Sequence, residues 1–131
     1  MIHIKYKLDK SGYHGIGLFS DEDLSVGQLI YTASPLLDVN LTQEQFDTIS
    51  DEEKEEIKWW GYFNESTKRW HVDFDVSKFI NHSPKGNLTQ DKNHEEAYLI
   101  TLRDIKRGEE LTQNYLEFES AEEFKERNIL N

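Results

Sequence analysis

The 131-residue sequence predicts one mainly β domain, built from several short strands in small sheets with few, short helices. Three observations support this fold class. Short runs of alternating apolar and polar residues recur along the chain, helix-start signals cluster near residues 42–60, and strands and helices do not alternate regularly. Seven Phe, six Tyr and three Trp supply bulky apolar surface for a single core, although the hydrophobic content is only 36%.

The first predicted strand covers residues 1–8, whose even-numbered side chains would share a half-buried face: Ile2, Ile4, Tyr6 and Leu8. Later strands are expected at residues 18–19, 28–33, 36–39, 61–63, 68–74, 97–102 and 110–112. Residues 64–67 are interpreted as a hairpin turn and residues 86–96 as a polar loop. Within 68–74, the apolar residues alternate with a polar face that carries His71 and Asp73.

Two capping boxes predict a helical insert at about residues 42–60. Thr42 with Gln45, and Ser50 with Glu53, have the spacing at which two side chains satisfy the free amides of a new helix. Phe46 with Ile49, and Ile57 with Trp60, would give each short helix an apolar stripe. A third box at Ser120–Glu123 predicts a terminal helix, so residues 119–131 are expected to form a helical flank to a domain at 1–118.

Composition excludes several functional classes. The formal net charge of −11 argues against direct nucleic-acid binding, which needs a basic face, and favours a basic protein partner. Without cysteine the chain has no disulfide and no cysteine-bound zinc, and an intracellular setting is expected. The longest apolar runs fall far short of the roughly 20 residues that cross a bilayer, so no membrane association is expected.

A polar loop held by apolar residues is the strongest candidate for a binding site. Phe79 and Ile80 lead directly into Asn81, His82 and Ser83, which places hydrogen-bonding side chains on an anchored base. Upstream, the Gly15-Ile16-Gly17 segment joins two predicted strands, where glycine lets the backbone approach a ligand closely. Downstream, a Gly-Glu-Glu-Leu-Thr segment at 108–112 precedes Tyr115.

These segments, in this order, resemble the SET domain of protein-lysine methyltransferases over roughly residues 3–118. The resemblance implies a β-clip fold in which the segment carrying Asn81 threads under the segment carrying Tyr115 as a pseudoknot. It further implies that S-adenosylmethionine binds one face while the target lysine of a basic protein, a histone for example, enters from the other. The helical insert would then shape the substrate groove.

The resemblance also assigns roles to individual residues. Gly15, Ile16, Gly17, Asn81, His82 and Tyr115 match the cofactor-binding positions, and Tyr115 also matches the catalytic position at the methyl-transfer point. No metal is implied, because the cysteine clusters that flank many SET domains are absent. The expected substrate channel comprises Tyr31, Gln113 and Phe118. Tyr31 is included because Ala33 stands where the family often has a channel tyrosine, and two residues along a strand return to the same face.

Two other hypotheses remain open from the residues alone. An iron-dependent oxygenase could use His71 and Asp73 with either His82 or His94, because two imidazoles and a carboxylate form a known iron-binding set. The second hypothesis is a SET-like module that has lost catalysis and only binds a basic protein.

The number of methyl groups that would be transferred stays open, because Gln113 replaces an aromatic residue that is common at that position in the family.

Overall fold

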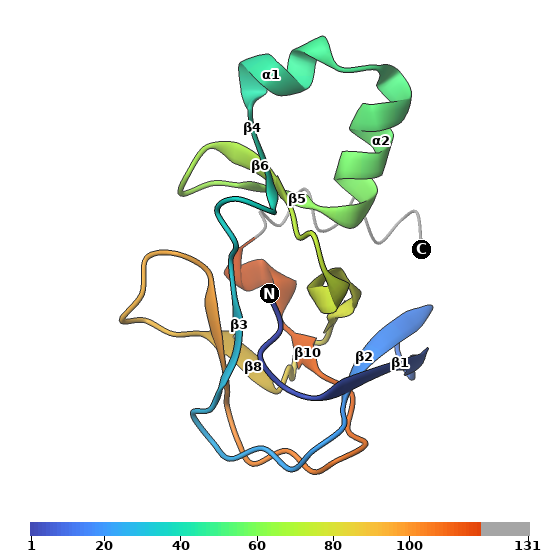
Figure 1. Ribbon diagram of the computed structural model, residues 1–131, viewed down its shortest axis with the longest axis vertical. Coiled ribbons are helices and arrows are strands. Elements are labelled where there is room, and N and C mark those ends of the chain that lie inside the picture. Colours follow the sequence, from blue (N-terminus) through green and yellow to red (C-terminus); the bar gives the residue numbers. More distant parts are fainter. Residues whose placement is uncertain (119–131) are drawn as a thin grey trace.

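Three small sheets and two helices make up the computed structural model, which describes residues 1–118 (Figure 1). The strands are β1 (Tyr6–Lys10), β2 (Ile16–Ser20), β3 (Leu29–Thr32), β4 (Val39–Thr42), β5 (Tyr62–Asn64), β6 (Arg69–Val72), β7 (Asn81–His82), β8 (Leu88–Gln90), β9 (Tyr98–Thr101) and β10 (Thr112–Gln113). The helices are α1 (Gln43–Thr48) and α2 (Asp51–Trp60), with short 3-10 turns η1 (Val76–Phe79) and η2 (Tyr115–Glu117). The predicted helix from Ser120 lies outside the described residues.

The mainly β class predicted from the sequence is confirmed. β1 and β2 form an antiparallel hairpin, β3-β9-β8-β10-β7 form a five-stranded sheet, and β4-β6-β5 form a three-stranded sheet. The core is apolar and centred on Leu18, Ile30, Leu88 and Leu111, all of them fully buried. No helix within residues 1–118 has the length and apolar character needed to cross a bilayer.

The predicted first strand is only partly correct. The strand begins at Tyr6, whereas Ile2 is buried and bridges to Tyr31. Tyr6 and Leu8 are 44% and 42% exposed, contrary to the expected half-buried face. The reason is that β1 is the outer strand of a two-stranded hairpin, so the core contacts come from β2, through Leu18.

Strand β8 lies inside the segment predicted to be a polar loop. Leu88 is its buried anchor, and the strand pairs antiparallel with β9 along Leu88–Gln90. Because β8 also borders β10, its backbone is hydrogen-bonded from both sides. Its short and mainly polar sequence did not indicate this pairing.

The last described strand is threaded between two earlier ones. β10 pairs in parallel with β7 (Thr112 opposite Asn81) and with β8 (Gln113 opposite Leu88). The loop that joins β7 to β8 therefore crosses over β10. At the crossing, a Cβ added to Gly86 would lie 2.8 Å from the Cα of Gln113, so glycine permits the close approach. This crossing is the pseudoknot expected from the resemblance.

Both predicted helix starts are confirmed. The capping boxes of Thr42 with Gln45 and of Ser50 with Glu53 are formed in both directions. In α1, Phe46 is buried and stacks on Trp70 of β6 with ring centroids 4.3 Å apart. The apolar stripe predicted for α2 is not buried: α2 buries no residue, and Trp60 is 39% exposed although its ring contacts Phe79.

The β4-β6-β5 sheet carries the insert (Figure 1). Its β5-β6 hairpin is confirmed, while the strand expected at 36–39 instead begins at Val39. Trp70 points toward α1, and the neighbouring His71 is 6% exposed. The polar side of β6 is therefore buried at His71, where Asn40 and Asp38 from the β4 region and the nearby Asp73 surround the imidazole.

Candidate functional site

Asn81 ties the glycine-rich loop to the threaded sheet. Its Nδ2 donates to the backbone oxygens of His14 and Ile16, at 2.9 and 3.1 Å, and lies 3.2 Å from a carboxylate oxygen of Glu110. Gly15, between the two carbonyls, has φ +51°, a conformation that glycine adopts without strain. The amide thus fixes the backbone of residues 14–16 against β7.

Glu110 is the second anchor of this loop, one that sequence analysis quoted in a motif without giving it a role. Its carboxylate accepts from Ser11 Oγ at 2.7 and 2.9 Å and from the Gly12 N–H at 3.1 Å. Gly17 makes room for it, because a Cβ on Gly17 would lie 2.5 Å from Glu110 Oε2. The structure therefore places Gly17 beside an anchoring carboxylate.

Asn87, which belongs to the sequence pattern but was given no role in the site, holds the crossing from inside. It is 5% exposed; its Nδ2 donates to the Glu110 carbonyl at 2.8 Å and its Oδ1 accepts from the Thr112 N–H at 2.9 Å. A single amide therefore mimics a strand partner for the chain entering β10. Its position four residues after Ser83 in the polar loop was the available signal.

His82 and Tyr115 meet across the crossing. The backbone N–H of Tyr115 donates to His82 Nδ1 at 3.0 Å, and the two rings are 5.4 Å apart. Partial burial, the largest cause, lowers the pKa of His82 below its ordinary value, while a hydrogen bond with the Gln113 backbone opposes the shift. The imidazole is therefore neutral near neutral pH, with Nδ1 as an acceptor.

The phenol of Tyr115 is held by the chain just before Asn81. Its hydroxyl donates to the carbonyl of Ile80. Because the hydroxyl hydrogen is engaged, the oxygen presents its remaining lone pairs as an acceptor. Phe118 stands next to it, with ring centroids 5.1 Å apart.

One cavity of about 1200 Å³ connects these groups. The predicted site residues on its wall are Gly15, Ile16, Tyr31, Asn81, His82, Gln113, Tyr115 and Phe118. Gly17 is the one predicted site residue that is not on this wall. Tyr62 of β5, which sequence analysis did not single out, also lines the cavity and packs its ring 4.4 Å from that of Phe118.

Tyr31 lies in the cavity wall as a neutral hydrogen-bond donor. Its hydroxyl donates to Asp73, and it is 4% exposed. Burial, the largest cause, and the charge of Asp73 raise the pKa of Tyr31 above its ordinary value. A phenol held in this way cannot serve as a base near neutral pH.

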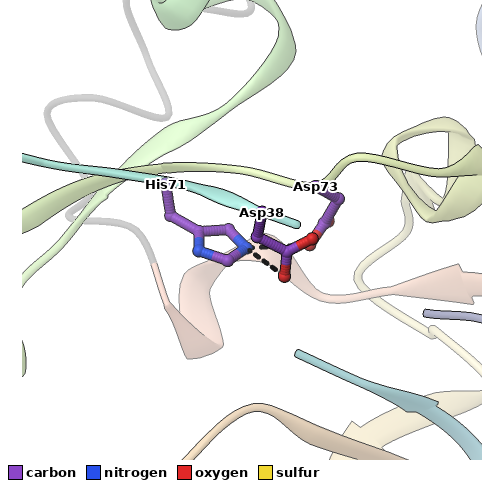
Figure 2. A group of neighbouring side chains, drawn as sticks. All are labelled: Asp38, His71 and Asp73. Carbon is purple, nitrogen blue, oxygen red and sulfur yellow. Dashed lines mark hydrogen bonds and ion pairs between the residues drawn. The ribbon is translucent and has the colours of Figure 1, made fainter. Parts of the chain in front are cut away.

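Asp73, the acceptor of the Tyr31 hydroxyl, belongs to a cluster with Asp38 and His71 (Figure 2). It is the one group of three potential metal ligands found among residues 1–118, and neither His82 nor His94 belongs to it. His82 instead accepts from Tyr115, and His94 pairs with Asp91 and stacks on Tyr98. The two-imidazole set that the oxygenase hypothesis requires is therefore not assembled.

The geometry defines a β domain with a threaded strand, in which Asn81 and His82 of β7 and Tyr115 after β10 line one cavity. The sequence matches the SET domain family over residues 15–116, and the chain belongs to this family. It is 29% identical over 118 residues to the variant-silencing SET domain-containing protein of Plasmodium falciparum, covering 83% of this chain and 4% of that protein.

Solved structures show the same fold. The Polycomb Repressive Complex 2 of Chaetomium thermophilum, bound to S-adenosylmethionine in an autoinhibited conformation, matches at TM-score 0.65 and 25% identity, over 96% of this chain and 17% of that chain. An apo form of that complex with two mutations matches at TM-score 0.69 and 24% identity, over 95% and 16% of the two chains. This chain thus spans only a small part of each relative.

Proposed function

We propose that this SET domain is an S-adenosylmethionine-dependent methyltransferase that acts on the side-chain amine of a lysine in a basic protein. The observation that carries the proposal is the contact of His82 with Tyr115 across the crossing, on the wall of one cavity that also holds Asn81 and the Gly15 loop. Family membership and the cofactor bound in a similar structure support it.

The residues fit the cofactor. Its sulfonium and ammonium carry positive charge, which backbone carbonyls accommodate and an imidazolium would oppose. The cavity wall includes residues 12–16, of which Gly12 and Gly15 present only backbone, and His82 on the same wall is neutral because burial lowers its pKa. Its volume exceeds the range of a few hundred to about 1,000 Å³ typical of small-ligand sites, which leaves space for a substrate side chain.

When bound, S-adenosylmethionine supplies an activated methyl group for in-line displacement by a neutral amine. A free lysine has a pKa of about 10.4, so near neutral pH only about one molecule in a few thousand is neutral. An aromatic wall that excludes water lowers that pKa by disfavouring the ammonium. Tyr115, Phe118 and Tyr62 are among the aromatic residues that line the cavity here, with neighbouring ring centroids 5.1 and 4.4 Å apart.

Tyr115 is assigned an orienting role. Since its hydroxyl hydrogen is engaged by Ile80, its oxygen is an acceptor that can align an amine before attack without adding a full charge. Asn81 acts indirectly, by holding the backbone of residues 14–16 that forms part of the cavity wall. Gln113 is 6% exposed and contributes a polar group to the wall.

The direct test has two measurements. Calorimetry should detect one S-adenosylmethionine bound per chain, and labelled methyl groups should appear on lysines of basic proteins, identified by mass spectrometry. Cofactor uptake without transfer to any basic protein would instead favour the binding module that has lost catalysis. Absence of both would contradict the proposal. We place this activity inside the cell, as the lack of cysteine suggested.

A further inference from the structure

The Asp38-His71-Asp73 cluster concentrates negative charge at the cavity. His71 Nε2 lies 2.8 Å from Asp73 Oδ1 and 3.6 Å from Asp38 Oδ2 (Figure 2). The side chains of Asp38 and His71 are 0% and 8% exposed, and that of Asp73 is 18% exposed. Within residues 1–118, no Lys or Arg forms an ion pair with either carboxylate. Two carboxylates therefore share one imidazole.

The cluster leaves a negative charge at the cavity. His71 Nδ1 lies 3.0 Å from Asn40 Oδ1, and its Nε2 lies 2.8 Å from Asp73 Oδ1. The two carboxylates outnumber the one imidazole, so at least one negative charge has no cation beside it, and a partly buried charge without a partner is costly.

Asp73 has a free acceptor. Its Oδ1 takes hydrogen bonds from Tyr31 and His71, whereas its Oδ2 accepts none from the described part of the chain. Asp73, Tyr31 and His71 all line the cavity, while Asp38 lies behind them. The carboxylate oxygen without a hydrogen bond therefore belongs to Asp73, which lines the cavity.

The rest of the cavity wall has the same sign of charge. Among residues 1–118, the charged residues on the wall, the histidines aside, are Glu65, Asp73, Glu95, Glu96 and Glu117, with Lys78 as the single cation. Asp73 and Tyr115 have different partners: Asp73 accepts from Tyr31 and His71, whereas Tyr115 bonds to Ile80 and His82. A group bound at Asp73 would therefore use contacts other than those around Tyr115, though both residues line one cavity.

We propose that Asp73 is the docking point for a second cationic side chain of the protein substrate, an arginine or lysine near the lysine that is methylated. This inference rests on the proposed function. Tyr31 and His71 hold one oxygen of Asp73, so the other is pre-oriented for a charge-assisted hydrogen bond. The substrate class is then a basic segment with at least two cations, and an isolated lysine is a poor substrate.

The test uses lysine peptides with otherwise neutral flanks, in which one arginine is introduced at each flanking position in turn. At one position, arginine should lower KM by about tenfold or more, while the isosteric but uncharged citrulline should not. Asp73→Asn should abolish this advantage, because the amide keeps the shape and an oxygen for Tyr31. Asp47→Asn, an equal charge loss on the exposed face of α1, should retain it.

Peptide binding measured by fluorescence anisotropy without donor separates the two proposals. Suppose that no peptide is methylated, but that the arginine peptide still binds more tightly than the citrulline peptide and loses this advantage in Asp73→Asn. The proposed function then fails and the docking point stands. An arginine advantage that survives Asp73→Asn, or none at any position, overturns the docking point. So does stoichiometric uptake of Mn²⁺ or Zn²⁺ in equilibrium dialysis that Asp73→Asn abolishes, since the cluster would then be a metal site.

Thermal melting establishes whether Asp73→Asn folds. Should it not fold, the wild-type protein decides: carbodiimide coupling of a peptide with lysine at the preferred position, followed by mass spectrometry, should join that lysine to Asp73. Coupling only at exposed carboxylates such as Glu65 would overturn the assignment.

Discussion

The Tyr115 backbone N–H and His82 Nδ1, thirty-three residues apart in sequence, are joined by a 3.0 Å hydrogen bond. It connects the turn that follows β10 to the strand that β10 borders. The phenol of Tyr115 returns along the same path to the Ile80 carbonyl. Tyr115, the proposed catalytic residue, is therefore held at its backbone and at its hydroxyl by residues 80–82, the segment that also carries Asn81.

Tyr115→Phe should remove methyl transfer while leaving the fold intact. Loss of an orienting polar group in a water-excluded site typically lowers kcat by about a hundredfold or more. Stability should fall by only about 1 kcal/mol, the usual net value of one hydrogen bond. Labelled-methyl transfer, thermal melting and donor calorimetry check the three effects separately. Transfer that survives undiminished would contradict the role assigned to Tyr115.

His82 should make stability and cofactor binding sensitive to acid. Because the folded-state pKa is depressed, the unfolded chain binds more protons below its own pKa of about 6.5. Stability is therefore unaffected well above pH 6.5 and is lost as the pH falls through 6.5 toward the folded-state pKa.

A glutamine at this position provides the control for that pH dependence. His82→Gln can still accept from the Tyr115 amide but cannot take up a proton in this range. The free energy of unfolding of the wild type and of His82→Gln should be measured by denaturation from pH 8 to pH 5. The difference between the two pH dependences gives the contribution of His82 protonation to stability. Calorimetry should show donor affinity falling over the same window in the wild type, because an imidazolium would repel the sulfonium. Parallel curves would contradict this assignment.

Gly17→Ala should destabilise the protein by roughly 1–3 kcal/mol through overpacking. The new methyl would lie 2.5 Å from Glu110 Oε2 and would displace a carboxylate that binds Ser11 and Gly12. Gly12→Ala is the matched control, since an added Cβ there meets nothing within 4 Å. Urea denaturation of the two variants should separate them clearly. Equal stabilities would show that Glu110 can yield without loss.

Gly86→Ala should be more damaging than Gly17→Ala, at about 3 kcal/mol or more. Its methyl would meet the backbone of Gln113 at 2.8 and 2.9 Å, and backbone in a threaded strand cannot rotate away. The crossing loop and β10 would have to separate, which also disturbs the Ser83 N–H to Gln113 carbonyl hydrogen bond of 3.1 Å. Hydrogen exchange at Ser83 and Gln113 reports this opening. Unchanged protection there would argue against the predicted steric conflict.

Sequence reasoning succeeded where the signals are local. The capping boxes at Thr42 and Ser50 are satisfied within one turn, so the helices could be predicted from residues three apart. β8 could not, because its strand character comes from β9 and β10 on either side. For the same reason Asp38 was missed: only the folded chain brings it to His71. A family pattern predicted the site formed by Asn81, His82 and Tyr115, and the cofactor-binding and catalytic roles of these residues stay predictions.

The threading of β10 between β7 and β8 also governs when the cavity can exist. During synthesis both strands leave the ribosome before their shared neighbour, and each presents an open hydrogen-bonding edge until residues 112–113 arrive. Until then His82 has no Tyr115 amide to accept from, and Asn87 has no Thr112 amide. The cavity is thus completed only once β10 has been made, and a chain halted before β10 exposes the unpaired edges of β7 and β8.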